Sequence, residues 1–185
     1  MALSLFIVVL GGRSLKSNIE IHDVRWVIGE SLEDTFPELR NQWLGNIKGL
    51  HIDSYKRIEY VDGYKIAISK CNNNNFFNKK KEEESLWFIN LGGYDPYKMY
   101  EEHAFTLVVA KRAIEAKKKA KEKWISNLKN KHNDDISGIK NFKQVDDLHS
   151  IKKIKSWEIK LICDPKKRNE ELIPDWFGYM RIDKF

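Results

Sequence analysis

The sequence contains the same unit twice, and this duplication limits the folds open to the chain more than any other feature. Leu10-Gly11-Gly12 recurs as Leu91-Gly92-Gly93, at an offset of 81 residues. With that offset and no gap, eight of the thirty-nine positions from Leu5 to Trp43 are identical in the second copy. In the first copy they are Leu5, Leu10, Gly11, Gly12, Glu20, His22, Val27 and Trp43. Because a repeated unit folds the same way each time, we predict two similar modules in tandem.

After Trp43 the offset rises to 93 residues, so that Asp53 corresponds to Asp146 and the second copy contains an insertion of twelve residues near 129–140. We predict four segments. They are a first repeat at residues 1–70, a flexible linker at 71–85, a second repeat at 86–162 and a C-terminal tail at 163–185 whose apolar run at 176–182 can add a final strand.

The pattern of apolar and polar residues in each copy predicts the order strand, strand, helix, strand, strand. The apolar runs 3–10 and 86–91 are typical of buried strands and end at Gly-Gly, where we expect a tight turn. A second strand follows at 23–28. A helix begins near 31–35 after the capping box Ser31 to Asp34. Its buried face is formed by Leu32, Phe36, Leu39 and Trp43, and Ala113, Ala120, Trp124 and Leu128 supply the equivalent face in the second copy.

The last two strands of each copy are predicted to form a hairpin. Asp62-Gly63 is a strong turn signal in the first copy, and Lys155-Ser156 is a weaker one in the second. The chain is therefore predicted to be an α+β protein. Its two ββαββ repeats form a pseudo-twofold pair of largely antiparallel sheet with helices on one side.

Composition indicates a compact protein of the cytoplasm. The 185 residues are 42% hydrophobic, which is enough for a substantial core. Cys71 and Cys163 lack the number for a disulfide framework and the spacing for a metal site, so we expect reduced thiols. The apolar N-terminus has no basic flank and is too short to cross a bilayer. No motif indicates a cofactor, a bound metal or a membrane.

The net charge of +6 is concentrated in one segment. Nine basic residues against two acidic ones lie between positions 110 and 131, on the predicted helix of the second copy. Clustered lysines bind phosphates, which makes nucleic acid one candidate partner, through Lys117, Lys118 and Lys121. The simpler interpretation is a solvated helix face, because no recognition motif accompanies the charge.

The main chemical candidates are two Glu-x-His pairs at equivalent positions, Glu20 with His22 and Glu101 with His103. Residues two apart share a strand face, so each pair presents a carboxylate and an imidazole together. Convergence of the two pairs would give a ligand, metal or acid-base site. The alternative is structural: each histidine binds its own Gly-Gly turn.

Two further patterns have the same dual interpretation. His51 and Asp53 share a strand face and could orient a general base, but Gln144 replaces the histidine in the second copy, which favours a structural role. The Gly-Gly pairs Gly11-Gly12 and Gly92-Gly93 could form anion-binding nests, but turn geometry explains them better.

These residues resemble a bacterial family, the domain of unknown function 1543, present here in two tandem copies. The resemblance rests on Leu10-Gly11-Gly12, the strand that begins at His22, residues 29–34, 50–53, 61–64 and 88–94, and Gly178-Tyr179. It implies no activity, since the family has none assigned.

The sequence leaves three functions open, and whether the chain is an enzyme remains undecided. The first is a non-catalytic or small-ligand-binding module whose site lies between the repeats. Its lining residues would be Glu20, His22, Glu101, His103, Gly11, Gly12, Gly92 and Gly93. The second is nucleic-acid binding through the helix at 110–131. The third is a metal-dependent or acid-base enzyme that uses the Glu-x-His strands.

Overall fold

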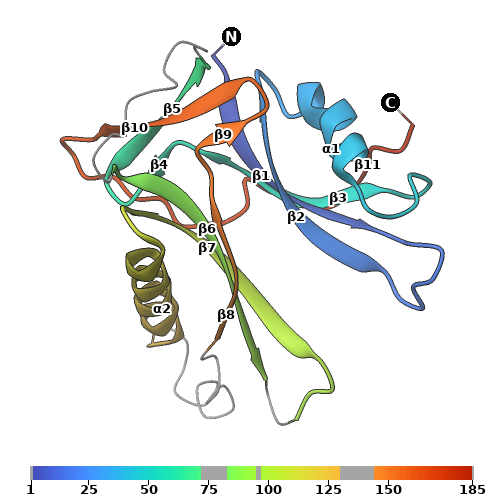
Figure 1. The fold of residues 1–185 in the computed structure, drawn as a ribbon. Helices are drawn as coiled ribbons and strands as arrows, with labels where there is room; N and C mark the ends of the chain where they lie inside the picture. The colour runs from blue at the N-terminus through green and yellow to red at the C-terminus, as the bar shows by residue number, and fades with distance from the viewer. Residues whose placement is uncertain (1, 72–82, 95–96, 130–143, 185) are drawn as a thin grey trace. The chain divides into compact units, whose positions relative to one another are not determined.

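The computed structural model describes residues 2–71, 83–94, 97–129 and 144–184 (Figure 1). Their sheets are mostly antiparallel and are accompanied by two α-helices, which confirms an α+β fold. The first copy contributes β1 (Ser4–Gly12), β2 (Ile21–Gly29), η1 (Glu33–Thr35), α1 (Phe36–Gln42), β3 (His51–Ile58), β4 (Tyr60–Val61) and β5 (Tyr64–Lys70). The second contributes β6 (Ser85–Tyr94), β7 (Glu101–Ala110), α2 (Ala113–Lys129), β8 (Gln144–Ser150), β9 (Lys153–Ile154) and β10 (Trp157–Cys163), followed by β11 (Trp176–Arg181).

The observed order differs from the predicted ββαββ unit. Three strands, rather than two, follow the helix in each copy, because the first predicted strand is interrupted, between β3 and β4 in the first copy and between β8 and β9 in the second. The hairpin turns lie where they were predicted. Asp62 and Gly63 have φ values of 51° and 82°, and Lys155 has a φ of 54°. Positive φ at both central residues, as at Asp62 and Gly63, is characteristic of a tight two-residue hairpin.

The chain divides into two compact units that cut across the sequence copies. Unit 1 comprises Met1–Cys71 and Lys153–Phe185, and unit 2 comprises Asn72–Lys152. In unit 1 the hairpin of the second copy pairs with the hairpin of the first, in a sheet of order β4-β5-β10-β9. Antiparallel pairing of β5 with β10 runs from Lys70 opposite Trp157 to Tyr64 opposite Cys163.

The second sheet of unit 1 has the order β11-β3-β1-β2 and carries α1 on one face. Every other residue of β1, at Phe6, Val8 and Leu10, faces the helix, as the period of a strand requires. The predicted helix face is buried in the same core, which contains Phe6, Val8, Leu10, Val27, Leu32, Phe36, Leu39, Trp43, Leu50, Ile52 and Ile182. Ser31 and Asp34 exchange backbone-to-side-chain hydrogen bonds, which confirms the capping box.

The sheet of unit 2 has the order β7-β6-β8 and packs against α2. Its core contains Ile89, Leu91, Val108, Ala110, Ala116 and Ala120. The β1–β3 register shifts between Val9 and Leu10, and the β6–β8 register shifts between Asn90 and Leu91, at the equivalent place. The two copies therefore share a β-bulge as well as their strand order.

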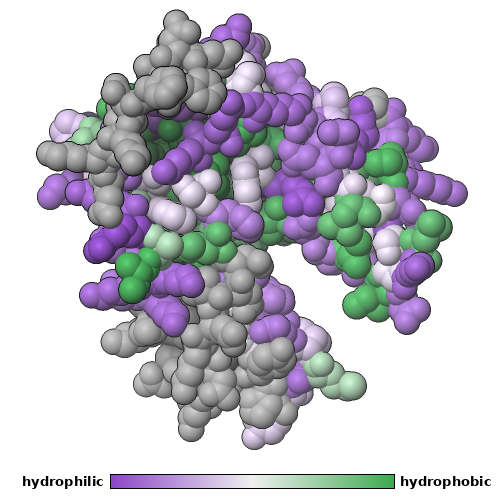
Figure 2. Space-filling view, viewed as in Figure 1, coloured by the Kyte–Doolittle hydropathy of each residue, from purple (hydrophilic) through white to green (hydrophobic). Residues whose placement is uncertain are grey.

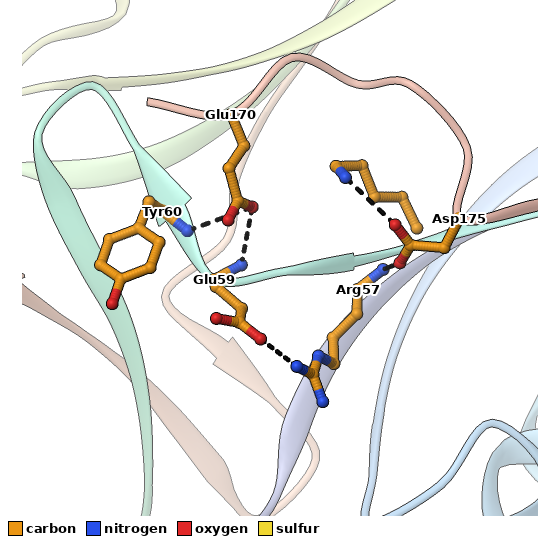
Figure 3. A network of polar contacts seen from close by, with 6 residues as sticks. Arg57, Glu59, Tyr60, Glu170 and Asp175 are labelled. Carbon is orange, nitrogen blue, oxygen red and sulfur yellow. Dashed lines mark hydrogen bonds and ion pairs between the residues drawn. The ribbon is translucent and has the colours of Figure 1, made fainter. Parts of the chain in front are cut away.

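Within unit 1, acidic side chains of the C-terminal segment accept hydrogen bonds from backbone N–H groups of the first copy (Figure 3). The N–H of Arg57 donates to Asp175 at 2.7 Å. The N–H groups of Glu59 and Tyr60 donate to Glu170 at 3.3 and 3.4 Å. These bonds lead the chain to β11, which pairs with β3.

A second contact secures the start of this segment. Asp164 is 5% exposed and accepts hydrogen bonds from the Arg168 side chain at 2.8 and 3.0 Å. Those bonds, with the backbone N–H groups of Arg168 and Lys166, hold the pKa of Asp164 well below its usual value. The Arg168 guanidinium also lies 3.8 Å from the centre of the Tyr60 ring.

Several sequence predictions fall outside the described residues: most of the linker, most of the insertion near 129–140, and the side chains of Trp124 and Leu128. No described helix combines the length and the apolar character that crossing a bilayer requires.

Candidate functional site

The candidate site is built around Gly11, at the centre of three neighbouring strands of unit 1. Gly11 on β1 lies opposite His22 on β2 and opposite His51 on β3. The predicted Gly-Gly turn is therefore wrong, because Gly11 and Gly12 are the last two residues of an extended strand, Gly11 paired on both sides and Gly12 paired with Ile21 of β2. The same pairing excludes an anion-binding nest at Gly11, since its backbone belongs to the ladder.

Glycine is needed at position 11 because the His51 ring occupies the space above it. A Cβ atom on Gly11 would lie 2.5 Å from Nε2 of His51 and 2.9 Å from Oδ2 of Asp53. Gly12 serves the opposite face, where a Cβ would lie 2.9 Å from the ring of Trp43. The first glycine makes room for the site and the second makes room for the core.

His51 is almost completely buried, with 1% of its surface exposed, although it is a polar residue. Its Nδ1 lies 2.8 Å from the carbonyl oxygen of Gly49. Its Nε2 lies 3.2 Å from Oδ1 of Asp53 and 3.5 Å from Oε1 of Glu20. Each ring nitrogen therefore faces oxygen acceptors.

Asp53 connects the two histidines. It falls at the register shift between β1 and β3, where Leu10 pairs with Ile52 and Val9 pairs with Ser54. Asp53 is the extra residue of this bulge, and it keeps the strand face of His51, two residues before it, so its carboxylate lies beside the imidazole. Its Oδ2 is 3.3 Å from Nε2 of His22. We call Glu20, His22, His51 and Asp53 the histidine cluster.

The histidine cluster is buried at one end and accessible at the other. The side chains of His22, Glu20 and Asp53 are 52%, 40% and 29% exposed, whereas that of His51 is 1% exposed. A molecule in solution can therefore reach the carboxylates, while His51 forms the floor beneath them.

Tyr179 covers His51 from the C-terminal strand. The two ring centres are 4.0 Å apart, and the planes are tilted by 33°. Tyr179 falls within the irregular stretch of β11 between Phe177 and Met180 and remains 62% exposed. Figure 2 shows hydrophobic side chains, in green, exposed near the β1–β2 turn. Tyr179 differs from these residues in its contact with the buried His51.

The protonation of His51 decides how the cluster is bonded. Because Gly49 offers an acceptor, Nδ1 of His51 carries a proton. With a second proton on Nε2 the ring also donates to the carboxylates of Asp53 and Glu20, whereas in the neutral ring Nε2 is an acceptor. Among the described residues, no group of three or more His, Cys, Asp or Glu side chains is arranged to hold a metal ion.

The equivalent place in unit 2 is built differently. His103 lies opposite Gly92, as His22 lies opposite Gly11. Its Nδ1, however, is 3.2 Å from the side-chain nitrogen Nδ2 of Asn90. Gln144 takes the backbone position of His51, opposite Gly92. Glu101 begins β7, opposite Tyr94. The predicted second set, Glu101, His103, Gly92 and Gly93, therefore has no histidine at the place of His51.

Four residues that the sequence singled out are brought together in unit 1. The structure places Glu20 and His22 around the His51–Asp53 pair, to which sequence reasoning gave a structural role. Tyr179 was missed as a site residue, and its only sequence signal was the Gly178-Tyr179 motif. Convergence of the two Glu-x-His strands stays a prediction, since His22 and His103 belong to different units.

A pocket of about 410 Å³ lies elsewhere in unit 1, between α1 and the β9–β10 hairpin. Lys155 and Glu38 form an ion pair at its wall. The remaining lining residues are Ile28, Asp34, Pro37, Asn41, Ile154 and Trp157. No residue of the histidine cluster lines it.

The lysine-rich helix α2 uses part of its charge internally. Lys119 and Lys123 donate to the backbone carbonyls of Val109 and Leu107 on β7, an edge strand of its sheet. Lys117, Lys118 and Lys121 are exposed. Nucleic-acid binding through these three residues stays a prediction.

Comparison with known proteins now places the chain in a family. The model of the Domain of Unknown Function DUF1543 matches residues 17–68 and 98–148, one segment in each copy. The chain belongs to the DUF1543 family. In this DUF1543 protein the first matched segment contains all four residues of the histidine cluster, and Tyr179 lies outside both segments.

One solved structure is similar over almost the whole length. The crystal structure of protein Il1583 from Idiomarina loihiensis is 30% identical, with a TM-score of 0.71. The match covers 97% of this DUF1543 chain and 98% of that chain. No curated protein matches.

Proposed function

We propose that this DUF1543 protein is a non-catalytic, small-ligand-binding module whose ligand contacts the histidine cluster of unit 1. The observation that carries the proposal is a buried imidazole that meets two partly exposed carboxylates, with Nε2 of His51 3.2 Å from Oδ1 of Asp53 and 3.5 Å from Oε1 of Glu20. A few convergent polar groups that solvent can reach are typical of a small-molecule site.

The surrounding construction supports a binding role. A glycine on the central strand leaves room for the imidazole, Asp53 lies on the same strand face two residues after His51, and Tyr179 packs against the ring. Rigid strands hold all four cluster residues or their neighbours, and sites on rigid elements need little reorganisation on binding.

The test is a ligand screen on the full-length protein by ligand-observed NMR. The panel contains alkylamines, carboxylates, neutral amides, mononucleotides, Mg²⁺ and Zn²⁺. We expect at least one member to bind the wild type and to be lost in His51→Gln, which installs the residue that the second copy has at this position. Absence of any binding, or binding that His51→Gln leaves unchanged, contradicts the proposal.

An acid-base enzyme is the second candidate, and one observation favours it. Asp53 lies 3.3 Å from Nε2 of the half-exposed His22, an arrangement in which a carboxylate orients an imidazole for proton transfer. Its test is mass spectrometry of any ligand found in the screen after incubation with wild type and with His22→Asn. Conversion by the wild type alone supports catalysis, and an unchanged ligand excludes it for that compound.

A further inference from the structure

The strand β7 is an edge of the described sheet of unit 2, and most of it is apolar. It runs from Glu101 to Ala110 and pairs with β6 along one side. Its last seven residues, 104–110, read Ala-Phe-Thr-Leu-Val-Val-Ala and contain no charge, glycine or proline. A long, uncharged and apolar edge strand is the kind to which another chain adds through backbone hydrogen bonds.

The hydrogen bonds of β6 show which backbone groups of β7 face the free edge. The carbonyl of Leu86 accepts a bond from the N–H of Ile151, directly after β8, so the polar groups of Leu86 point toward β8. Leu86 lies opposite Val109, and Phe88 lies opposite Leu107. Backbone groups of successive residues point to alternate sides of an antiparallel strand, so the carbonyls of Val109 and Leu107 point away from β6. An added strand would bond to these groups.

Two lysines of α2 already occupy these carbonyls. Nζ of Lys119 donates to the carbonyl of Val109 at 2.5 Å, and Nζ of Lys123 donates to that of Leu107 at 2.9 Å. Four residues of a helix advance about 6 Å and two residues of a strand about 6.8 Å, so the two spacings match. An incoming strand would have to displace both charged donors, and hydrogen bonds with a charged donor are the stronger kind.

The first copy has its charge in a different place. Its edge strand β2 contains Asp23 and Arg25, and charged residues within an edge strand discourage pairing. The equivalent positions of β7, 81 residues later, are the neutral Ala104 and Thr106. The helix α1 contains no lysine. Charge therefore lies at the edge in both copies, within the strand in the first and from the helix in the second.

From these observations we infer that Lys119 and Lys123 protect β7 against strand addition by a second copy of this chain. The β7 strand of that second copy is the partner that fits, because the same edge on both chains gives a symmetric antiparallel interface. This role is independent of ligand binding at the histidine cluster.

The experiment compares the full-length wild type with the double variant Lys119→Met/Lys123→Met by sedimentation velocity over a range of protein concentrations. Methionine keeps an unbranched side chain and removes the ammonium donor. We expect the double variant to self-associate at least about tenfold more strongly than the wild type, which must first give up the lysine bonds. Lys119→Arg/Lys123→Arg, which retains charged donors, should behave as the wild type does.

The matched control is Lys117→Met/Lys118→Met, on exposed residues of the same helix. It removes the same charge and adds the same apolar surface, so it separates edge protection from a general effect of charge or hydrophobicity. We expect it to keep the oligomeric state of the wild type.

Hydrogen exchange identifies the surface that associates. The N–H groups of Phe105 and Leu107 face the free edge and should gain protection when the Lys119→Met/Lys123→Met variant associates. Three results overturn the inference: an unchanged oligomeric state, association equal to that of the control, or association without protection in β7. If circular dichroism shows that the double variant does not fold, the single variants Lys119→Met and Lys123→Met are compared with Lys117→Met, and the same results decide.

Discussion

Gly11 is the residue on which the geometry of the histidine cluster depends. Gly11→Ala would place a methyl group 2.5 Å from Nε2 of His51. We expect the variant to lose about 1–3 kcal/mol of unfolding free energy, the typical cost of overpacking, and to displace the imidazole. Urea denaturation measures the loss, and the His51 NMR signals report the displacement.

A double-mutant cycle controls this prediction. In a His51→Ala background the imidazole ring that the new methyl group would meet is absent. The loss of unfolding free energy caused by Gly11→Ala should therefore be much smaller than in the wild type. Equal costs in both backgrounds would show that the imidazole is not the reason for glycine at this position.

Asp164 makes the stability of unit 1 sensitive to acid. Its hydrogen bonds with Arg168 hold its pKa below the ordinary value of 3.8 in the folded state. A depressed pKa stabilises the fold above the unfolded value and ceases to do so as the pH falls through the folded value. Asp164→Asn should therefore lower the stability at pH 7, and the difference from wild type should shrink below about pH 3.8.

Urea titrations at pH 7 and pH 3 measure that difference. Glu158→Gln is the control, because this carboxylate is half exposed and its ion pair with Lys160, at 3.8 Å, is long. It should change the stability little at either pH. A constant penalty for Asp164→Asn across the range would contradict the assignment.

At this scale the sequence revealed the residue types of the site better than their arrangement. Repetition of Glu-x-His drew attention to Glu20 and His22. The contacts of His22 with Asp53 and of Glu20 with His51 depend on the pairing of β1 with both β2 and β3, which no local pattern predicts. Tyr179 comes from a strand that begins 125 residues after His51. Long-range pairing of this kind is fixed by the whole fold rather than by neighbouring residues.

Among the elements, α2 is a lysine-rich helix that hydrogen-bonds to the sheet against which it packs. Lys119 and Lys123 bond to carbonyls of the edge strand β7. We expect Lys119→Met and Lys123→Met each to cost about 0.5–1.5 kcal/mol of unfolding free energy, the net value of a hydrogen bond. Lys117→Met and Lys118→Met, on exposed residues, should stay within about 0.5 kcal/mol of wild type. Thermal and urea unfolding compare the four variants.

The same lysines allow the nucleic-acid hypothesis to be tested separately. A gel shift at low salt with a Lys117, Lys118 and Lys121 triple glutamine variant asks whether the exposed lysines bind phosphates. If the wild type produces no shift, this hypothesis is wrong.

Ile182, the residue after β11, completes the core of the first sheet. Ile182 is fully buried, and its N–H donates to the carbonyl of Leu50 at 3.0 Å. We expect Ile182→Ala to cost about 2–5 kcal/mol of unfolding free energy, as other buried truncations do. Ile173→Ala, on a side chain that is 64% exposed, should cost less than about 0.5 kcal/mol. Similar losses for the two variants, measured by urea unfolding, would contradict this role.

Periodicity predicted the elements well where one face is buried against a neighbour close in sequence. The helix face of α1 and both hairpin turns are examples. The break between β3 and β4 was not predicted, because residues 51–61 have no glycine or proline to mark it.

For the whole molecule, the main surprise is that the hairpin of the second copy belongs to unit 1. The N–H of Cys71 donates to the carbonyl of Ser156 at 2.8 Å, so the chain leaves and re-enters unit 1 at neighbouring points. We expect a chain in which residues 72–152 are replaced by a short Gly-Ser linker to fold cooperatively. Residues 1–71 alone, without β10 and β11, should not. Circular dichroism and urea unfolding distinguish the two outcomes.

That division also sets an order of events during synthesis. A ribosome delivers the chain from its N-terminus, and domains generally fold as their segments emerge. Unit 2 is continuous and can fold once residue 152 is outside the exit tunnel. Unit 1 must wait for β10, β11 and Ile182, although its first strands were made earliest. The apolar faces of β1 and β3 are therefore the part of the nascent chain that stays exposed to solvent longest.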